Sequence, residues 1–189
     1  MGSFSTIKKE QNAVIASAVQ QVVKQISTDH EAAKAQFTAT SSLHEGLLAD
    51  IQIRQFDLVS DEPKSLGGTD LGPNPVELVL GAFAACQEIV IAAYAAVLGI
   101  EVQRVNVKAT GDIDLRGFFN VCDKIRPGFT KVTYETEIIT RETDEAKLAQ
   151  LRFFAQNRCP VLDILQEPVP TEGTVTFKEK VAIPEYQAG

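Results

Sequence analysis

The sequence predicts an α+β protein in which antiparallel sheet packs around one long apolar helix. Three observations support this class. Stretches in which apolar and polar residues alternate strictly occur both before and after the apolar helix, as in half-buried antiparallel strands. Helical and extended segments do not alternate as they would in a parallel α/β fold. The chain has 189 residues, 44% hydrophobic and 23% charged, which suits one domain with a full core.

The first predicted element is a helix over residues 11–36. Alanine is frequent there, and apolar residues recur near helical spacing to form a stripe opposite a face of Gln, Lys and Asp. We expect this helix to pack on its own domain or on a second subunit. Residues 1–36 are therefore taken as an N-terminal helical extension, and residues 37–189 as the main domain.

Two strands are predicted next, over residues 37–40 and 47–58, with a hairpin turn between them. In the second strand Ile51 and Ile53 alternate with polar neighbours. A Gly- and Pro-rich loop over residues 61–74 follows. Loops of this length in compact domains are more often functional than idle.

The long helix is predicted over residues 75–98. Asn74 is a plausible N-cap, Pro75 suits the first turn and Glu77 favours the positive helix end. Gly99 is expected to end the helix at the C-prime position. Nearly every residue between is apolar or small, so burial on most sides is expected. Charged and amide residues interrupt the run, which favours a core helix over a membrane span.

The remainder of the chain adds strands and two helices. Alternating residues predict strands over 105–109, 131–138 and 174–178. Between the last two strands, helices are predicted over 144–157 and 161–166, on either side of a Cys-Pro break.

The net charge and the N-terminal sequence indicate which binding partners and which cellular compartment to expect. The net charge of −7 argues against nucleic acid or an anionic membrane surface, either of which would require a basic face. No signal peptide or membrane segment is evident, and the cysteine count is odd. We therefore expect a reducing, cytoplasmic location, with no nucleic-acid or membrane partner.

The residues that could bind a metal or a cofactor are scarce. The three cysteines are far apart in sequence, and neither of the two histidines is near one of them. Structural zinc needs about four such ligands at close spacing. No glycine-rich phosphate loop of recognised spacing occurs either. We expect neither a metal nor a cofactor.

Thiol chemistry remains the main option. Cys86 lies about three turns into the long helix, too far for much help from the helix dipole. Its position alone fits a small buried hydrophobe. A reactive thiol would need a cation or a hydrogen-bond donor from elsewhere. Cys159, at the helix break, is the second candidate, whereas Cys122 is expected to be incidental. The candidate cations are Arg54, Arg116, Arg126 and Arg158.

Several motifs around these cysteines occur together. They are Leu66-Gly67-Gly68-Thr69-Asp70, Gly72-Pro73-Asn74-Pro75, Ala84-Ala85-Cys86, Arg126-Pro127-Gly128-Phe129 and Cys159-Pro160-Val161-Leu162-Asp163. Together they resemble the OsmC/Ohr family, which groups osmotically inducible protein C with organic hydroperoxide resistance protein. The resemblance covers roughly residues 37–180 and leaves the N-terminal helix outside.

The resemblance implies an intertwined α+β homodimer with antiparallel sheets around a buried central helix and sites at the subunit interface. In peroxidase members the first cysteine attacks a hydroperoxide and becomes a sulfenic acid. The second cysteine resolves it as a disulfide, which a dithiol reductant reduces. By this resemblance Cys86 is the peroxidatic and Cys159 the resolving residue of an antioxidant, stress-response oxidoreductase.

This chain departs from the peroxidase pattern at two positions. Those members carry a glutamate directly after Asn-Pro, where this chain has Val76. Its Glu77 comes one residue later, about 100° round the helix. They also carry an arginine in the first hairpin, near Leu43-His44 here. The residues expected to activate the thiolate are therefore Arg54, Arg116, Arg158 and Glu77.

Two alternatives to peroxide reduction stay open at this point. One is a non-peroxidatic family member that binds a small apolar ligand at the dimer interface, lined by Phe83, Val90 and Phe118. The other is a thiol redox sensor that uses the N-terminal helix as a docking element.

Overall fold

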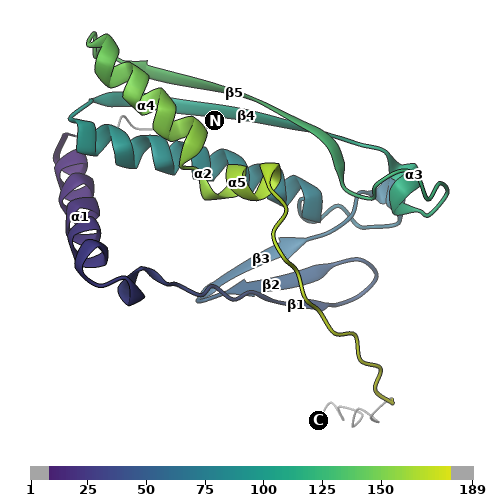
Figure 1. Cartoon of the computed structure of the whole chain (residues 1–189). Coiled ribbons are helices and arrows are strands. Elements are labelled where there is room, and N and C mark those ends of the chain that lie inside the picture. Colours follow the sequence, from purple (N-terminus) through teal and green to yellow (C-terminus); the bar gives the residue numbers. More distant parts are fainter. Residues whose placement is uncertain (1–8, 180–189) are drawn as a thin grey trace, which may run out of the picture.

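The computed structural model describes residues 9–179 and has an α+β architecture around one long helix, α2 (Pro75–Leu98). Figure 1 shows two antiparallel sheets on either side of α2. The first has the order β1 (Thr40–Leu43), β2 (Ala49–Ile53), β3 (Phe56–Ser60), and the second pairs β4 (Val102–Ile113) with β5 (Phe129–Thr140). The predicted fold class is confirmed at this level.

The other helices lie at the ends and the corners of this arrangement. They are α1 (Lys9–Thr28), the 3-10 turns η1 (Glu31–Ala33) and η2 (Lys64–Leu66), α3 (Leu115–Phe118), α4 (Glu145–Asn157) and α5 (Pro160–Gln166). The N-terminal helix, the strands at β4 and β5, and the helices at α4 and α5 were all predicted.

The ends of α2 are set by local residues, as the sequence predicts. The Asn74 side chain accepts a hydrogen bond from the N–H of Glu77 at 2.9 Å, and the Glu77 carboxylate accepts one from the N–H of Asn74 at 2.8 Å. This reciprocal capping box satisfies two N–H groups that the helix leaves free. Gly99 follows the helix in the left-handed conformation, with φ +69°, which favours glycine.

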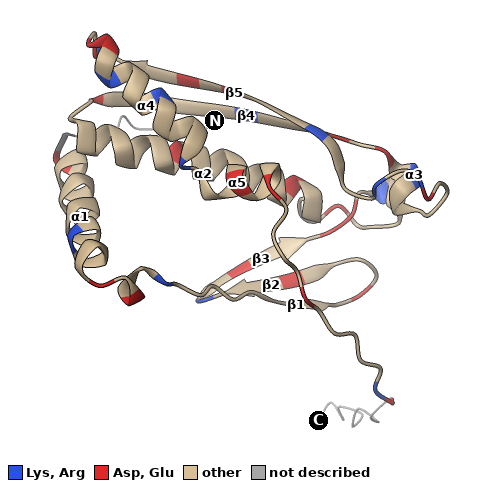
Figure 2. Ribbon diagram, viewed as in Figure 1, with Lys and Arg blue, Asp and Glu red and all other residues tan. Residues whose placement is uncertain are grey.

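The prediction that α2 is buried on most sides is wrong for a single chain. Its buried residues form one stripe, made of Phe83, Gln87, Ile91, Ala95 and Ala96. Ile89, on another face, is 69% exposed. Figure 2 shows how few charges α2 carries. By length and composition α2 could cross a membrane, but the core helix of a soluble protein can have the same length and composition. Of the most apolar 18-residue window of α2, 17% is buried.

One core cluster joins α2, β4 and α4. Its buried residues are Ile91, Ala95, Ile100, Val102, Leu151 and Ala155. The buried Gln87 side chain donates a hydrogen bond to the carbonyl of Ala155 at 3.0 Å, which ties α2 to α4. Tyr94 and Phe154 stack across the same contact, with ring centroids 4.0 Å apart.

The first sheet corrects two predicted boundaries. The predicted strand 47–58 is a hairpin, β2 and β3, that turns at Arg54, whose φ is +56°. Two consecutive polar residues, Arg54 and Gln55, break the alternation at that point, and this phase change marks the turn. The strand predicted at 37–40 forms instead at β1, where Ser41 pairs with Ile51.

Two further predictions differ from the structure. The helix predicted over 11–36 ends at Thr28, because Asp29 accepts a hydrogen bond from the N–H of Glu31 and starts a separate 3-10 turn. The strand predicted at 174–178 has no pairing partner in the described chain. That segment is extended, and Val175 and Phe177 are 85% and 95% exposed.

Candidate functional site

The loop that leads into α2 is held by one buried carboxylate. Asp61 is 2% exposed and accepts hydrogen bonds from the Thr69 hydroxyl at 2.5 Å and from the N–H groups of Glu62, Thr69 and Leu71. The hydrogen bond from the Thr69 hydroxyl is the largest cause that lowers the pKa of Asp61 below its usual value. The loop therefore enters α2 in one fixed path.

Glycine is required where this loop folds back on itself. A Cβ atom on Gly68 would lie 1.8 Å from the carbonyl oxygen of Glu62, and one on Gly72 would lie 2.6 Å from that of Val59. Contacts this short exclude any side chain. The glycines of the two loop motifs therefore serve close backbone packing that positions the start of α2.

Cys86 and Cys159 meet in a second core cluster. Cys86 lies on α2 and is half-buried, whereas Cys159, at the N-cap of α5, is 2% exposed. Both belong to the cluster of Phe83 and Leu162, and Cys159 lies close enough to Cys86 to raise the pKa of that thiol. Both are free thiols. The structure thus brings together the two cysteines that the sequence singled out, from different helices.

The surroundings of Cys86 are apolar, with a single main-chain donor. Burial raises the pKa of the Cys86 thiol above its usual value, and the neighbouring Cys159 raises it further. A hydrogen bond from the N–H of Val161 acts in the opposite direction. No arginine or lysine of residues 9–179 is among the groups that shift this pKa.

Two of the predicted activators have partners of their own. Glu77 is held in the capping box of α2 by Asn74. Arg116 forms an ion pair with Asp114, with 2.5 Å between Nη2 and Oδ2. Neither acts on Cys86 within one chain, so their activating role stays a prediction.

The other two predicted activators lie over aromatic rings. The Arg54 guanidinium lies 5.2 Å from the ring centroid of Phe56 at the β2–β3 turn. Arg158, next to Cys159 in sequence, is exposed and lies 6.0 Å from the ring centroid of Phe153. Their role also stays a prediction.

The first hairpin carries a histidine–aspartate pair. His44 Nε2 is hydrogen-bonded to Asp50 Oδ2, and both side chains are more than half exposed. This pair lies at the end of the β1–β2 hairpin, near the position where the peroxidase pattern has an arginine. Within residues 9–179, no group of three or more His, Cys, Asp or Glu side chains could hold a metal ion.

The predicted apolar pocket is only partly assembled. Phe83 and Val90 pack in the cysteine cluster, whereas Phe118 lies on α3, is 60% exposed and contacts Phe119 edge-to-face. Tyr134 takes the place next to Phe83, with ring centroids 5.1 Å apart at 88°. Sequence reasoning missed Tyr134, although its place in the alternation of β5 marked it as facing the core.

Sequence reasoning also missed the N–H donor to Cys86. Pro160 occupies the first helical position of α5 and has no N–H, so Val161 supplies the first N–H available there. The Cys-Pro-Val order could have indicated this donor. It could not have indicated that Cys86, far away in sequence, would receive the hydrogen bond.

Comparisons with known proteins give one consistent family. The model of the OsmC-like protein family matches residues 68–173. A search of curated proteins finds no match. The solved structures described below are less than 25% identical to the chain, so they support the fold alone.

An OsmC-like protein from Mycoplasma pneumoniae has a TM-score of 0.60 and 22% identity, over 70% of this chain and 89% of its own. The organic hydroperoxide resistance protein OsmC from Legionella pneumophila has a TM-score of 0.50 and 21% identity, over 70% of this chain and 92% of its own. An organic hydroperoxide resistance protein from Elizabethkingia anophelis has a TM-score of 0.50 and 18% identity, over 71% of this chain and 91% of its own. With the family model matching more than half of its residues, the chain belongs to the OsmC-like family.

Proposed function

We propose that this protein reduces organic hydroperoxides, with Cys86 as the peroxidatic thiol and Cys159 as the resolving thiol. The observation that carries the proposal is the contact between these two thiols inside an apolar cluster. Structural relatives named as organic hydroperoxide resistance proteins support the same chemistry. An apolar environment also suits a substrate with an organic substituent better than it suits hydrogen peroxide.

The proposed reaction has three steps. The Cys86 thiolate attacks the hydroperoxide, the O–O bond breaks, and one proton is taken up to give an alcohol and a sulfenic acid on Cys86. The Cys159 thiol then displaces water and forms a disulfide, before a second peroxide can over-oxidise the sulfenic acid. A dithiol reductant passes two electrons and two protons to the disulfide, which restores both thiols.

The molecule is proposed to act as a homodimer in a reducing, cytoplasmic compartment. Within residues 9–179, the β1–β3 sheet and much of α2 expose apolar side chains that a second copy would cover. A second copy could also bring Arg54 or another cation toward Cys86, since no cation of residues 9–179 acts on that thiol. Free thiols and the odd cysteine count fit a reducing environment.

The test is stopped-flow oxidation of the reduced protein by cumene hydroperoxide and by hydrogen peroxide. We expect faster oxidation by cumene hydroperoxide, no rapid phase in Cys86→Ser, and a stable sulfenic acid without a disulfide in Cys159→Ser. Cys122→Ser is the matched control and should behave as the wild type. A wild-type rate no faster than that of a free thiol, with either peroxide, would contradict the proposal.

A second candidate function is a non-peroxidatic member that binds a small apolar ligand beside the two thiols. The observation that favours it is the raised pKa of Cys86 in an apolar cluster where no cation of residues 9–179 acts on the thiol. This candidate predicts that a peroxide oxidises Cys86 no faster than it oxidises the thiol of glutathione. The protein would still form a saturable complex with an apolar ligand.

A further inference from the structure

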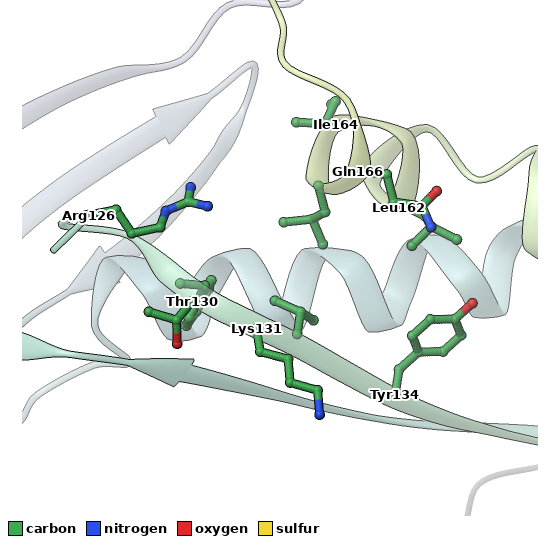
Figure 3. Close-up of a pocket in the computed structure, with 10 residues that line it drawn as sticks. Arg126, Thr130, Lys131, Tyr134, Leu162, Ile164 and Gln166 are labelled. Carbon is green, nitrogen blue, oxygen red and sulfur yellow. The ribbon is translucent and has the colours of Figure 1, made fainter. Parts of the chain in front are cut away.

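A cavity lies between β5 and α5, and neither Cys86 nor Cys159 is among the residues that line it. Its volume is about 350 Å³, within the range of sites that bind small organic molecules. Figure 3 shows Thr130, Lys131 and Tyr134 on the strand side, with Leu162, Ile164 and Gln166 on α5 across the cavity.

The floor of the cavity is apolar and firmly supported. Val132, Tyr134, Leu162 and Leu165 line it, and all four also pack in the cluster around Cys159. Leu162 is 5% exposed, so its side chain is held by the core behind it. The floor therefore presents a fixed apolar surface to a ligand.

The charge around this cavity is of one sign. The residues that line it include Arg126 and Lys131 but no Asp or Glu. In Figure 3 the Arg126 guanidinium is directed toward the α5 side, whereas the Lys131 ammonium points away from α5. No ion pair joins Arg126 to a carboxylate within residues 9–179. A cavity whose only charged lining residues are basic contrasts with the net charge of −7 of the chain.

Close packing around two glycines fixes the cationic end of the cavity. A Cβ atom on Gly117 of α3 would lie 2.3 Å from the carbonyl oxygen of Arg126. A Cβ atom on Gly111 would lie 2.4 Å from the ring of Phe129, which lines the cavity. Gly117 allows close packing of the segment just before β5, and Gly111 that of the first residue of β5, so Arg126 projects from a defined backbone.

We propose that this cavity binds an amphipathic monoanion, a carboxylate with an aliphatic or aromatic body. The apolar body lies on Val132, Leu162 and Leu165, and the carboxylate binds the Arg126 guanidinium. Arginine suits this role because its planar donors match both oxygens of a carboxylate. The binding goes beyond the proposed function and does not require Cys86 to react.

The test is calorimetric titration of the full-length protein with octanoate and with 1-octanol, which has the same body without the charge. We expect octanoate to bind more tightly than octanol. Arg126→Gln should weaken octanoate binding by about tenfold and leave octanol unchanged, while Arg126→Lys should retain part of the affinity. The matched control is Arg152→Gln, on the exposed side of α4, with wild-type affinity expected.

A second variant tests the site without removing the arginine. Ile164 lines the cavity and is 57% exposed, so the Ile164→Glu variant should fold normally. Its carboxylate should lower the affinity for octanoate by charge repulsion. Cys86→Ser should bind octanoate as the wild type does, which separates this site from the thiol chemistry. Equal affinities for octanoate and octanol, unchanged octanoate binding in Arg126→Gln, or no saturation below about 10 mM would overturn the proposal.

Discussion

Cys86 combines a position suited to redox chemistry with surroundings that disfavour its thiolate. Its partner Cys159 is in contact, but burial raises the pKa of Cys86 and only the N–H of Val161 opposes this. The residue types and their motifs could be recognised from the sequence. The contact between the thiols, and the lack of a cation acting on Cys86 within the described part of the chain, could not be recognised. Both depend on how α2 and α5 pack, and sequence spacing does not encode that packing.

A raised pKa predicts how the reactivity of Cys86 depends on pH. Because the thiolate is the reactive form, each pH unit below the pKa lowers the reactive fraction about tenfold. We expect the iodoacetamide alkylation rate of Cys86, followed by mass spectrometry, to keep rising at pH values where the rate of a free cysteine, with its pKa of about 8.5, has already levelled off. Glutathione is the reference thiol. A plateau near neutral pH would show that a cation reaches Cys86 in the assembled protein.

Asp61 predicts a pH-dependent contribution to stability. Its native hydrogen bonds lower its pKa, so the ionised form stabilises the folded state above the unfolded pKa of about 3.9. That contribution is lost as the pH falls through the native pKa. We expect Asp61→Asn to lower the Tm at pH 7, and the difference from the wild type to shrink below pH 4, measured by circular dichroism.

The control for Asp61 is Asp57→Asn, an exposed position on β3 with no side-chain hydrogen bond among the described contacts. We expect it to leave the Tm nearly unchanged. If Asp61→Asn lowered the Tm equally at pH 3 and pH 7, the stabilisation would not come from the ionised carboxylate.

At the scale of elements, boundaries that depend on residues within one turn are predictable from the sequence. Boundaries that depend on pairing with a distant strand are not. Asn74 and Gly99 mark the ends of α2 because caps act within one turn. The residues at 174–178 alternate as a strand should, yet a strand also needs a neighbouring edge, which sequence alone does not identify. The sequence marks the turn at Arg54 only by two consecutive polar residues, Arg54 and Gln55, and the alternation on both sides predicts a continuous strand.

The contact between α2 and α4 depends on one buried amide. Gln87 donates to the carbonyl of Ala155, and Gln87 is 1% exposed. Gln87→Leu keeps most of the volume but leaves that carbonyl without its donor, which should cost about 1–3 kcal/mol of unfolding free energy. Urea unfolding measures the change, with the exposed neighbour Glu88→Gln as control. A loss no larger than that of Glu88→Gln would mean that the amide hydrogen bond contributes little.

For the whole molecule, apolar surface remains exposed within residues 9–179. Ile51 pairs with Leu58 and Ile53 with Phe56, so these four side chains share one face of the β1–β3 sheet. Phe56 is 51% exposed and Leu58 42%. The alternation that predicted these strands correctly identified an apolar face. Residues 9–179 leave this face exposed, and the alternation does not indicate what would cover it.

This face predicts a homodimer whose stability depends on β3. Burying a Leu or Phe side chain contributes about 1.5–3 kcal/mol, so Phe56→Asp or Leu58→Glu should shift the dimer toward monomer. Light scattering after gel filtration should give twice the 20.5 kDa chain mass for the wild type. Asp57→Lys, on the opposite face of the same strand, should stay dimeric. A wild type that stays monomeric would contradict the dimer, whereas variants that stay dimeric would place the interface elsewhere, with α2 the next surface to test.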